Sequence, residues 1–182
     1  MPDEAKLVET ESGLEAAGDG WFVVNVRDAA WWRQREVFGY GCPFENRNDP
    51  IFSQLGIRLV VLQPGEPNCR YHAESAQEGF LVLSGECTVL VEEQERPLRA
   101  WDFVHCPGGT RHVFVGAGDG PCVILMVGAR PPEGSIVYPV SEPALAHGAG
   151  VQVETHDPSD AYADLPEPRR EPLPELGLPW QR

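Results

Sequence analysis

The chain has 182 residues, of which 42% are hydrophobic and 9% aromatic, and its formal net charge at pH 7 is −14. This length and apolar fraction are typical of one globular domain with extensions, and the chain is too short for two ordinary domains. The negative charge, most of it near the two ends, argues against nucleic acid or a membrane as a partner, because both require a clustered positive surface.

Targeting and redox signals in the sequence predict a cytoplasmic protein. No stretch reaches the roughly eighteen apolar residues of a membrane helix, and the acidic start lacks the basic and apolar regions of a secretory signal. The five cysteines are an odd number and include no CxxC pair, which excludes a complete disulfide framework. We therefore expect a soluble protein with reduced thiols.

The first fifty residues combine a polar start with aromatic segments. Residues 1–20 are polar and interrupted by glycine, so we expect an irregular and flexible N-terminal segment. Residues 21–26 are rich in β-branched and aromatic side chains and predict the first strand. Residues 29–38 predict a short helix or turn, and the polar loop that ends at Pro50 is expected to serve as a lid or a subunit contact.

The middle of the chain predicts a series of short strands. The 19 glycines and 18 prolines favour turns over long helices. Short strands at this spacing indicate an all-β sandwich or barrel, and the jelly roll is the closed form that hides its strand edges. The predicted strands cover residues 57–63, 79–83, 87–92, 102–106, 111–115 and 122–127.

Polar residues interrupt these apolar strands at two places, first at His72, Glu74 and Glu78, and then at His112. Imidazole and carboxylate groups together suit a divalent first-row ion, and two histidines with one carboxylate leave positions open for a substrate. Alternate residues of a strand share a face, so Glu78 lies on the same face as the apolar Phe80. The pattern predicts a metal site at the mouth of an apolar barrel.

The C-terminal part of the chain changes in composition. Ten of the eighteen prolines lie after residue 130, and proline lacks the N–H that a central strand requires. One more strand is expected over residues 135–139. Residues 141–182 then predict an acidic, proline-rich extension, and its last part, residues 162–182, is expected to pack as an arm on the barrel or on a neighbouring subunit.

Two segments, residues 71–85 and 101–116, resemble the two cupin motifs, G-x5-H-x-H-x3-4-E-x6-G and G-x5-P-x-G-x2-H-x3-N. The matching positions are His72, Glu78 and Gly85 in the first motif, and Pro107, Gly109 and His112 in the second. The resemblance implies a cupin-type jelly-roll β-barrel over residues 21–140, with its motif-bearing core at 57–129. It also implies a homodimer and one divalent transition metal, either iron, manganese, nickel, zinc or copper, held by His72, Glu74, Glu78 and His112.

Three positions depart from the cupin motifs. Glu74 replaces the second histidine, Trp101 replaces the opening glycine of the second motif, and Gly116 replaces its asparagine. As a ligand, Glu74 would add negative charge and favour harder ions. It could equally turn outward and leave three ligands, so both interpretations stay open.

The cupin resemblance does not fix the activity, because cupins include dioxygenases, isomerases and non-catalytic binding proteins. We predict a small-molecule enzyme of dioxygenase or isomerase type, in which Glu74 or Glu78 is also a candidate base. The alternative is a non-catalytic module that binds or senses a small molecule. A third possibility is an inert scaffold whose arm is exchanged between subunits.

Other side chains near the motifs have both functional and structural interpretations. A thiolate of Cys69 or Cys106 could join a zinc site, although a small buried hydrophobe is the favoured interpretation for each. His105 could face the cavity from its strand. Arg70 and Tyr71 could orient an acidic substrate, but we expect structural roles for both.

Overall fold

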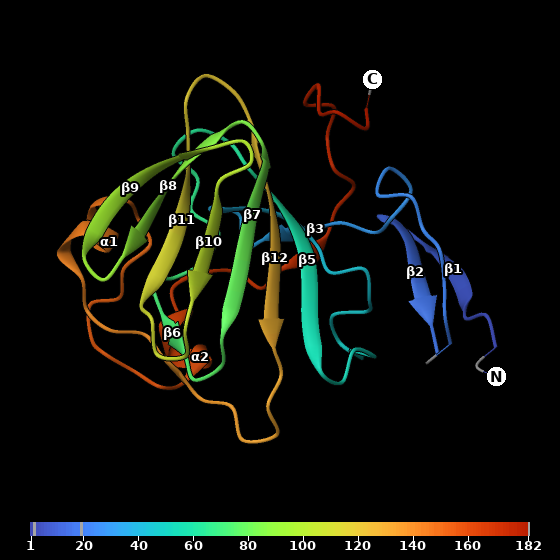
Figure 1. Cartoon of the computed structure of the whole chain (residues 1–182), viewed down its shortest axis with the longest axis horizontal. Coiled ribbons are helices and arrows are strands. Elements are labelled where there is room, and N and C mark those ends of the chain that lie inside the picture. Colours follow the sequence, from blue (N-terminus) through green and yellow to red (C-terminus); the bar gives the residue numbers. More distant parts are fainter. Residues whose placement is uncertain (2, 19, 182) are drawn as a thin grey trace.

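The structure, a computed structural model, describes residues 1, 3–18 and 20–181. A rolled set of antiparallel strands forms the main body, and a separate hairpin lies beside it (Figure 1). The strands are β1 (Lys6–Thr10), β2 (Gly13–Ala17), β3 (Trp32–Gln34), β4 (Phe38–Cys42), β5 (Leu55–Leu62), β6 (Ala73–Glu74), β7 (Glu78–Ser84), β8 (Glu86–Val91), β9 (Gln94–Arg99), β10 (Phe103–Cys106), β11 (His112–Ala117), β12 (Cys122–Ala129), β13 (Ile136–Val137) and β14 (Arg169–Arg170). The helices are α1 (Glu142–Ala146) and α2 (Pro158–Ala161), and no helix of the described residues is long and apolar enough to cross a membrane.

Two sheets enclose the core. Among the described residues, the larger sheet has the strand order β10-β7-β12-β5-β4-β3-β14, and the smaller has the order β11-β8-β9. The main core cluster draws Val60, Phe80 and Ile124 from the larger sheet and Val89 and Phe114 from the smaller. Their inner faces therefore meet in one apolar interior, which confirms the predicted all-β, jelly-roll type of barrel.

Strand β5 shows why the predicted strand over residues 57–63 is almost continuously apolar. Val60 and Leu62 point into the barrel core, whereas Leu59 and Val61 belong to a second cluster on the outer face. Leu178 from the C-terminal arm completes this outer cluster. Both faces of the strand are therefore buried, so the usual alternation of polar and apolar residues is lost.

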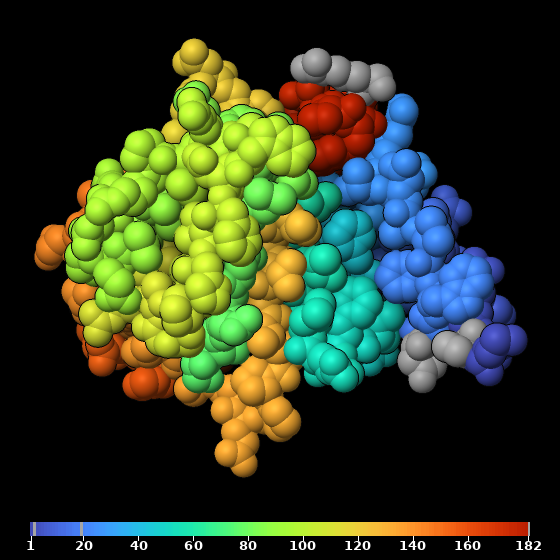
Figure 2. Space-filling model, viewed as in Figure 1, coloured from blue at the N-terminus to red at the C-terminus, as the bar shows by residue number. Residues whose placement is uncertain are grey.

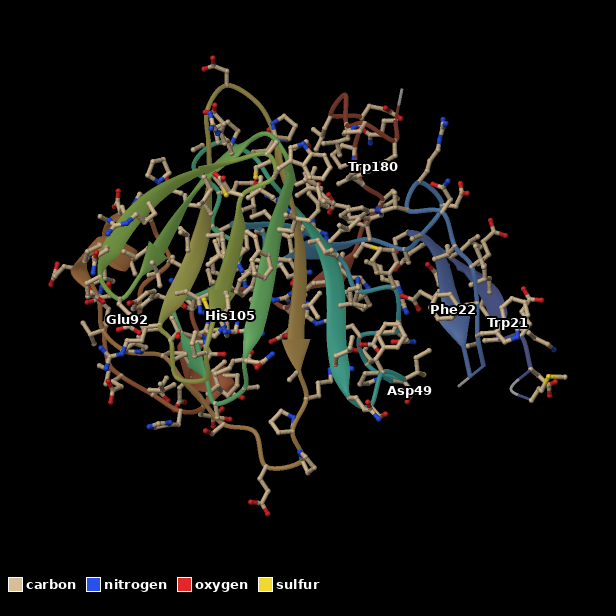
Figure 3. The ribbon with its side chains drawn as sticks, in the orientation of Figure 1. Trp21, Phe22, Asp49, Glu92, His105 and Trp180 are labelled. Atoms are coloured by element: carbon tan, nitrogen blue, oxygen red, sulfur yellow. The ribbon has the colours of Figure 1, made fainter. Side chains whose placement is uncertain are left out.

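The C-terminal arm packs on the outside of the barrel, one of the two places expected for it. Trp180 stacks on Trp31 with 6.1 Å between ring centroids, and Figure 3 shows Trp180 beside the junction of the barrel and the N-terminal hairpin. Earlier in the extension, Ser141 and Asp157 cap the short helices α1 and α2 with their side-chain oxygens.

The expectation of an irregular N-terminal segment was wrong in its secondary structure, because β1 and β2 pair as a hairpin. In Figure 2 this segment forms the blue lobe at one side of the molecule. The strand predicted over residues 21–26 is absent from the described structure, where only Trp21 makes a bridge, to Glu4. A strand needs a partner along its length, and residues 22–26 have none there. Residues 29–38, expected to form a short helix or a turn, contain β3 and a tight turn at residues 35–37.

Candidate metal centre

His72 and His112 lie directly opposite each other in an antiparallel bridge. The amide of His72 donates to the carbonyl of His112 (3.2 Å), and the amide of His112 donates to the carbonyl of His72 (2.8 Å). This is the pattern of a hydrogen-bonded cross-strand pair, which puts both side chains on one face. The two imidazole centroids are 4.9 Å apart, and both side chains are buried.

The Nδ1 atom of each imidazole fixes the orientation of its ring. His72 Nδ1 donates to the carbonyl of Arg70 (2.8 Å), and His112 Nδ1 donates to the carbonyl of Thr110 (3.0 Å). Because a carbonyl only accepts, the proton of the neutral ring lies on Nδ1 and the Nε2 lone pair is free. Burial lowers the pKa of both histidines to about 4, so both are neutral at pH 7. This is the form of histidine that binds a metal.

Glu78 begins β7 and turns its carboxylate toward the histidines. Its Oε2 atom lies 3.4 Å from His112 Nε2, and its side chain is 11% exposed. One donor atom from each of His72, Glu78 and His112 lies within 4.8 Å of the others. Burial, and then the charge of Glu74, raises the pKa of Glu78 to about 7, while the charge of Arg58 opposes the shift. A bound cation would reverse this shift, because it favours the ionised carboxylate.

Two glycines keep space open beside Glu78. Glu78 is paired with Gly128 of β12, which is paired in turn with Gly56 of β5. A Cβ atom at Gly128 would lie 3.5 Å from Glu78 Oε1, and one at Gly56 would lie 3.2 Å from the Arg130 guanidinium. Glu78, Gly128 and Gly56 thus lie side by side on three neighbouring strands at the mouth of the barrel. Only Glu78 has a side chain there, which leaves room for a ligand.

Glu74 lies at the edge of this centre. Its Oε1 atom is 3.9 Å from His72 Nε2, but Glu74 is outside the group whose donor atoms lie within 4.8 Å of one another. Its side chain is 37% exposed, against 11% for Glu78. The carboxylate of Glu74 therefore faces the accessible side of the centre.

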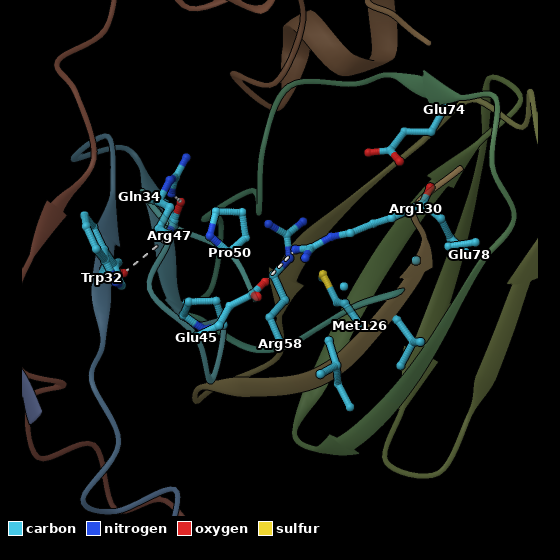
Figure 4. A pocket seen from close by; sticks show the side chains of 17 residues that line it. Trp32, Gln34, Glu45, Arg47, Pro50, Arg58, Glu74, Glu78, Met126 and Arg130 are labelled. Carbon is cyan, nitrogen blue, oxygen red and sulfur yellow. Dashed lines mark hydrogen bonds and ion pairs between the residues drawn. The ribbon is translucent and has the colours of Figure 1, made fainter. Parts of the chain in front are cut away.

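Two cavities open beside the three donor residues. One has a volume of about 300 Å³ and includes Glu74 and Glu78 in its wall, as Figure 4 shows. The other has a volume of about 240 Å³ and includes His72 and Glu74. Both volumes suit a small molecule, and the first is at the lower end of the range for ligand pockets.

Arginines in these cavities were not predicted from the sequence. Arg58 and Arg47 line both cavities. Arg58 pairs in register with Met126, which belongs to the barrel core, so it lies on the inner face of β5 together with Val60. The period-2 pattern of residues 57–63 contained this signal, since Arg58 is two residues before Val60.

The other candidates have structural positions. Burial raises the pKa of Cys69 to about 12 and that of Cys106 to about 11, so both thiols are protonated at pH 7. Arg70 forms a two-pronged ion pair with Asp164 (2.7 and 2.8 Å) and so ties the C-terminal extension to the barrel. Tyr71 is fully buried in a small apolar cluster.

The suggestion that His105 faces the cavity was wrong. His105 is exposed on the outer face of β10, where Figure 3 labels it. It lines a shallow apolar hollow there together with Phe103. Alternate residues of a strand share a face. In β10 the face that carries Cys106 is buried, so His105 lies on the opposite, exposed face.

Comparison with known proteins agrees with this architecture. A family model described as "Cupin domain" matches residues 58–128, which run from β5 through β12. Residues 58–128 therefore form a cupin domain. No curated protein matches this chain.

Similar solved structures include a sugar phosphate isomerase of the cupin superfamily from Silicibacter pomeroyi, with 31% identity over 47% of this chain and 56% of that chain, and a TM-score of 0.44. A candidate sugar phosphate isomerase from Acidithiobacillus ferrooxidans has 29% identity over 46% of this chain and 55% of that chain, also with a TM-score of 0.44. An RmlC-like cupin from Methanocaldococcus jannaschii has 19% identity over 45% and 75%, with a TM-score of 0.42. This cupin spans only about half the length of the first two structures.

Two departures from the cupin motifs have visible structural consequences. Trp101, which replaces a glycine, adopts a left-handed backbone with φ of 77° and exposes 74% of its surface. Gly116, which replaces an asparagine, leaves no room for a side chain, because a Cβ atom would lie 2.1 Å from the carbonyl oxygen of Gln63. Neither position contributes to the metal centre.

Proposed function

We propose that this cupin is an enzyme that acts on a small molecule with a divalent transition metal held by His72, Glu78 and His112. The observation that carries this proposal is the convergence of two neutral imidazoles and one carboxylate beside an accessible cavity. Two histidines and one carboxylate can hold an ion while leaving positions open for substrate.

The chemistry of the donor set fits such an ion. Both Nε2 lone pairs are free because the Nδ1 protons are donated to backbone carbonyls. Two donors on one ion at about 2.0–2.2 Å cannot be more than about 4.4 Å apart, so donors within 4.8 Å of one another need only a small inward movement. The ion would supply Lewis acidity and, if it is redox-active, electron transfer.

Glu74 and Glu78 have different roles in this proposal. Glu78 is buried against His112 and serves as a ligand. Glu74 faces the cavities and is therefore free to accept or donate a proton at a bound substrate. This division of roles suits an isomerase, which must move a proton, while the same ligand set also serves dioxygenases.

Metal analysis of purified protein tests the proposal. We expect about one equivalent of a transition metal in the wild type and less than about a tenth of an equivalent in His112→Ala. His147→Ala is a matched control, because His147 Nε2 also contacts a carboxylate, that of Glu95 (2.8 Å), but on the surface. Melting curves for each variant show whether the fold is kept. Metal retained in folded His112→Ala, or absent from the wild type under conditions that spare weak sites, would contradict the proposal.

Oxygen dependence separates the two reaction types. A substrate screen on the metal-loaded protein should show turnover with oxygen consumption for a dioxygenase, and equal turnover with and without oxygen for an isomerase. Binding without turnover would instead support the non-catalytic binding or sensing module. We propose that the protein acts in the cytoplasm as a homodimer, which solution mass measurements can test.

A further inference from the structure

Two arginines in the cavity walls have no acidic partner in the part of the chain that the structure describes. Arg130 is paired with Glu45 (2.6 Å), and Arg35 is paired with Glu167 (3.3 Å). Among the described residues, the side chain of Arg47 donates only to the neutral side chain of Gln34 (2.7 Å), and Figure 4 shows these two residues side by side in the cavity wall. Across residues 1, 3–18 and 20–181, the side chain of Arg58 has neither a hydrogen bond nor an ion pair. Two guanidinium groups without a carboxylate partner among the described residues therefore lie at one site, in a chain whose net charge is −14.

The two guanidinium groups come from different elements and reach the same space. Arg58 stands on the inner face of β5, and Arg47 lies on the loop between β4 and β5. Both line each of the two cavities. Partial burial, and then the positive charges of Arg58 and Arg35, lower the pKa of Arg47, in keeping with the crowding of guanidinium groups in the cavity walls. Such crowding is relieved when an anion binds.

The net charge around the larger of these two cavities favours the binding of an anion once a metal is present. The wall of this cavity contains three arginines and three glutamates, so that its positive and negative charges balance when all six are ionised. These residues are Arg47, Arg58, Arg130, Glu45, Glu74 and Glu78. A divalent ion on the adjacent donors would raise the local charge to about plus two. In addition, Trp32 of the same wall has a buried indole N–H with no acceptor among the described residues.

We propose that the substrate of this centre carries an oxyanion group, a phosphate or a carboxylate, that binds Arg58 and Arg47. This inference rests on the proposed function and names its substrate class. The planar guanidinium forks match the oxygens of such a group. Because His72 and Glu74 line the same cavity as both arginines, a small molecule anchored there places its other end at the metal ligands and at Glu74.

Calorimetric titration with inorganic phosphate and with acetate tests this inference. Arg58→Gln and Arg47→Gln should each weaken the binding of the preferred anion by about tenfold or more, because each removes a charged hydrogen-bond donor. Arg58→Lys should give an intermediate loss, since it keeps the charge without the fork. Arg96→Gln is the matched control: Arg96 also donates to a glutamine side chain, that of Gln94 (2.6 Å), but lies on the exposed strand β9.

Each titration is run on metal-loaded and metal-free protein, with metal content and melting temperature measured for every variant. Tighter binding of phosphate than of acetate identifies a phosphate site, and the reverse identifies a carboxylate site. Equal affinities in wild type, Arg58→Gln and Arg47→Gln would overturn the inference, even if the metal is bound normally. Conversely, an arginine-dependent anion affinity in protein that binds no metal would keep the anion site and reject the metal centre.

Discussion

Lowering the pH should weaken metal binding by an amount that reports how the three donors are protonated. In the metal-free protein the pKa of Glu78 is about 7, whereas the pKa values of His72 and His112 are about 4. An ion requires the ionised carboxylate and the neutral imidazoles. Between pH 7 and pH 4, binding should therefore displace one proton, from Glu78, and above pH 7 it should displace none.

The expected magnitude follows from this proton count. One displaced proton lowers the apparent affinity about tenfold per pH unit below the pKa, and Glu78 is about half ionised at pH 7, so the change from pH 7 to pH 5 should weaken binding about fiftyfold. Histidines with ordinary pKa values near 6.5 would behave differently. They would release two protons below that pH in addition to the one from Glu78, and the affinity would fall about a thousandfold for every single pH unit.

Calorimetry with Zn²⁺ at about pH 5.5, in two buffers of different ionisation enthalpy, counts the released protons. A competing chromophoric chelator gives the apparent affinity across the pH range. In Glu78→Gln the affinity should be lower throughout, but its pH dependence above pH 5 should disappear. The release of about three protons by the wild type would refute the reasoning, because it would mean that His72 and His112 are charged and therefore hydrated before the metal binds.

Three further predictions concern positions outside the metal centre. Trp101→Gly should raise the free energy of unfolding by about 1 kcal/mol in denaturant titrations, since it relieves a left-handed backbone at an exposed site; a loss of stability would contradict this. Gly116→Asn, which restores the cupin motif, should lower it by about 2 kcal/mol, because the side chain meets Gln63. Phe103→Glu should reduce the mass measured by light scattering to that of a 20.0 kDa monomer if the apolar outer face forms the dimer; an unchanged dimer mass would exclude that face.

The barrel could be predicted from the sequence because its central strands are short apolar runs separated by turns. The strand predicted over residues 122–127 lies within β12, which is buried between β5 and β7. In contrast, β9 was missed, because it is polar, exposed and contains Pro97, which an edge strand tolerates. The N-terminal hairpin was missed for a similar reason: its residues carry little of the β-branched content on which a strand prediction depends.

The candidate metal ligands could be predicted because each was tied to a spaced motif, and the structure brings the donor atoms of His72, Glu78 and His112 together. Spacing could not place Glu74, because it belongs to a two-residue strand whose side-chain direction depends on its partner, β13. Arg47 has no periodicity to reveal it, since it lies on a loop and reaches the cavity only through the tertiary fold.

The position of Glu74 decides which of the two interpretations of that residue is correct, and Glu74→Gln tests it. The charge of Glu74 raises the pKa of Glu78, so removing that charge should lower the pKa of Glu78 and move the onset of the pH dependence below pH 7. The slope of one proton per metal should remain, because Glu78 is still the group that must ionise.

Metal affinity above pH 7 separates the two interpretations in the same experiment. If Glu74 faces the substrate side, as its exposure and its distance from the buried donors indicate, Glu74→Gln should keep the affinity and lose turnover. If Glu74 moves inward to become a fourth ligand, Glu74→Gln should weaken binding as strongly as Glu78→Gln does. The first result would mean that the carboxylate in place of the cupin histidine supplies a proton-transfer group next to a three-ligand metal centre.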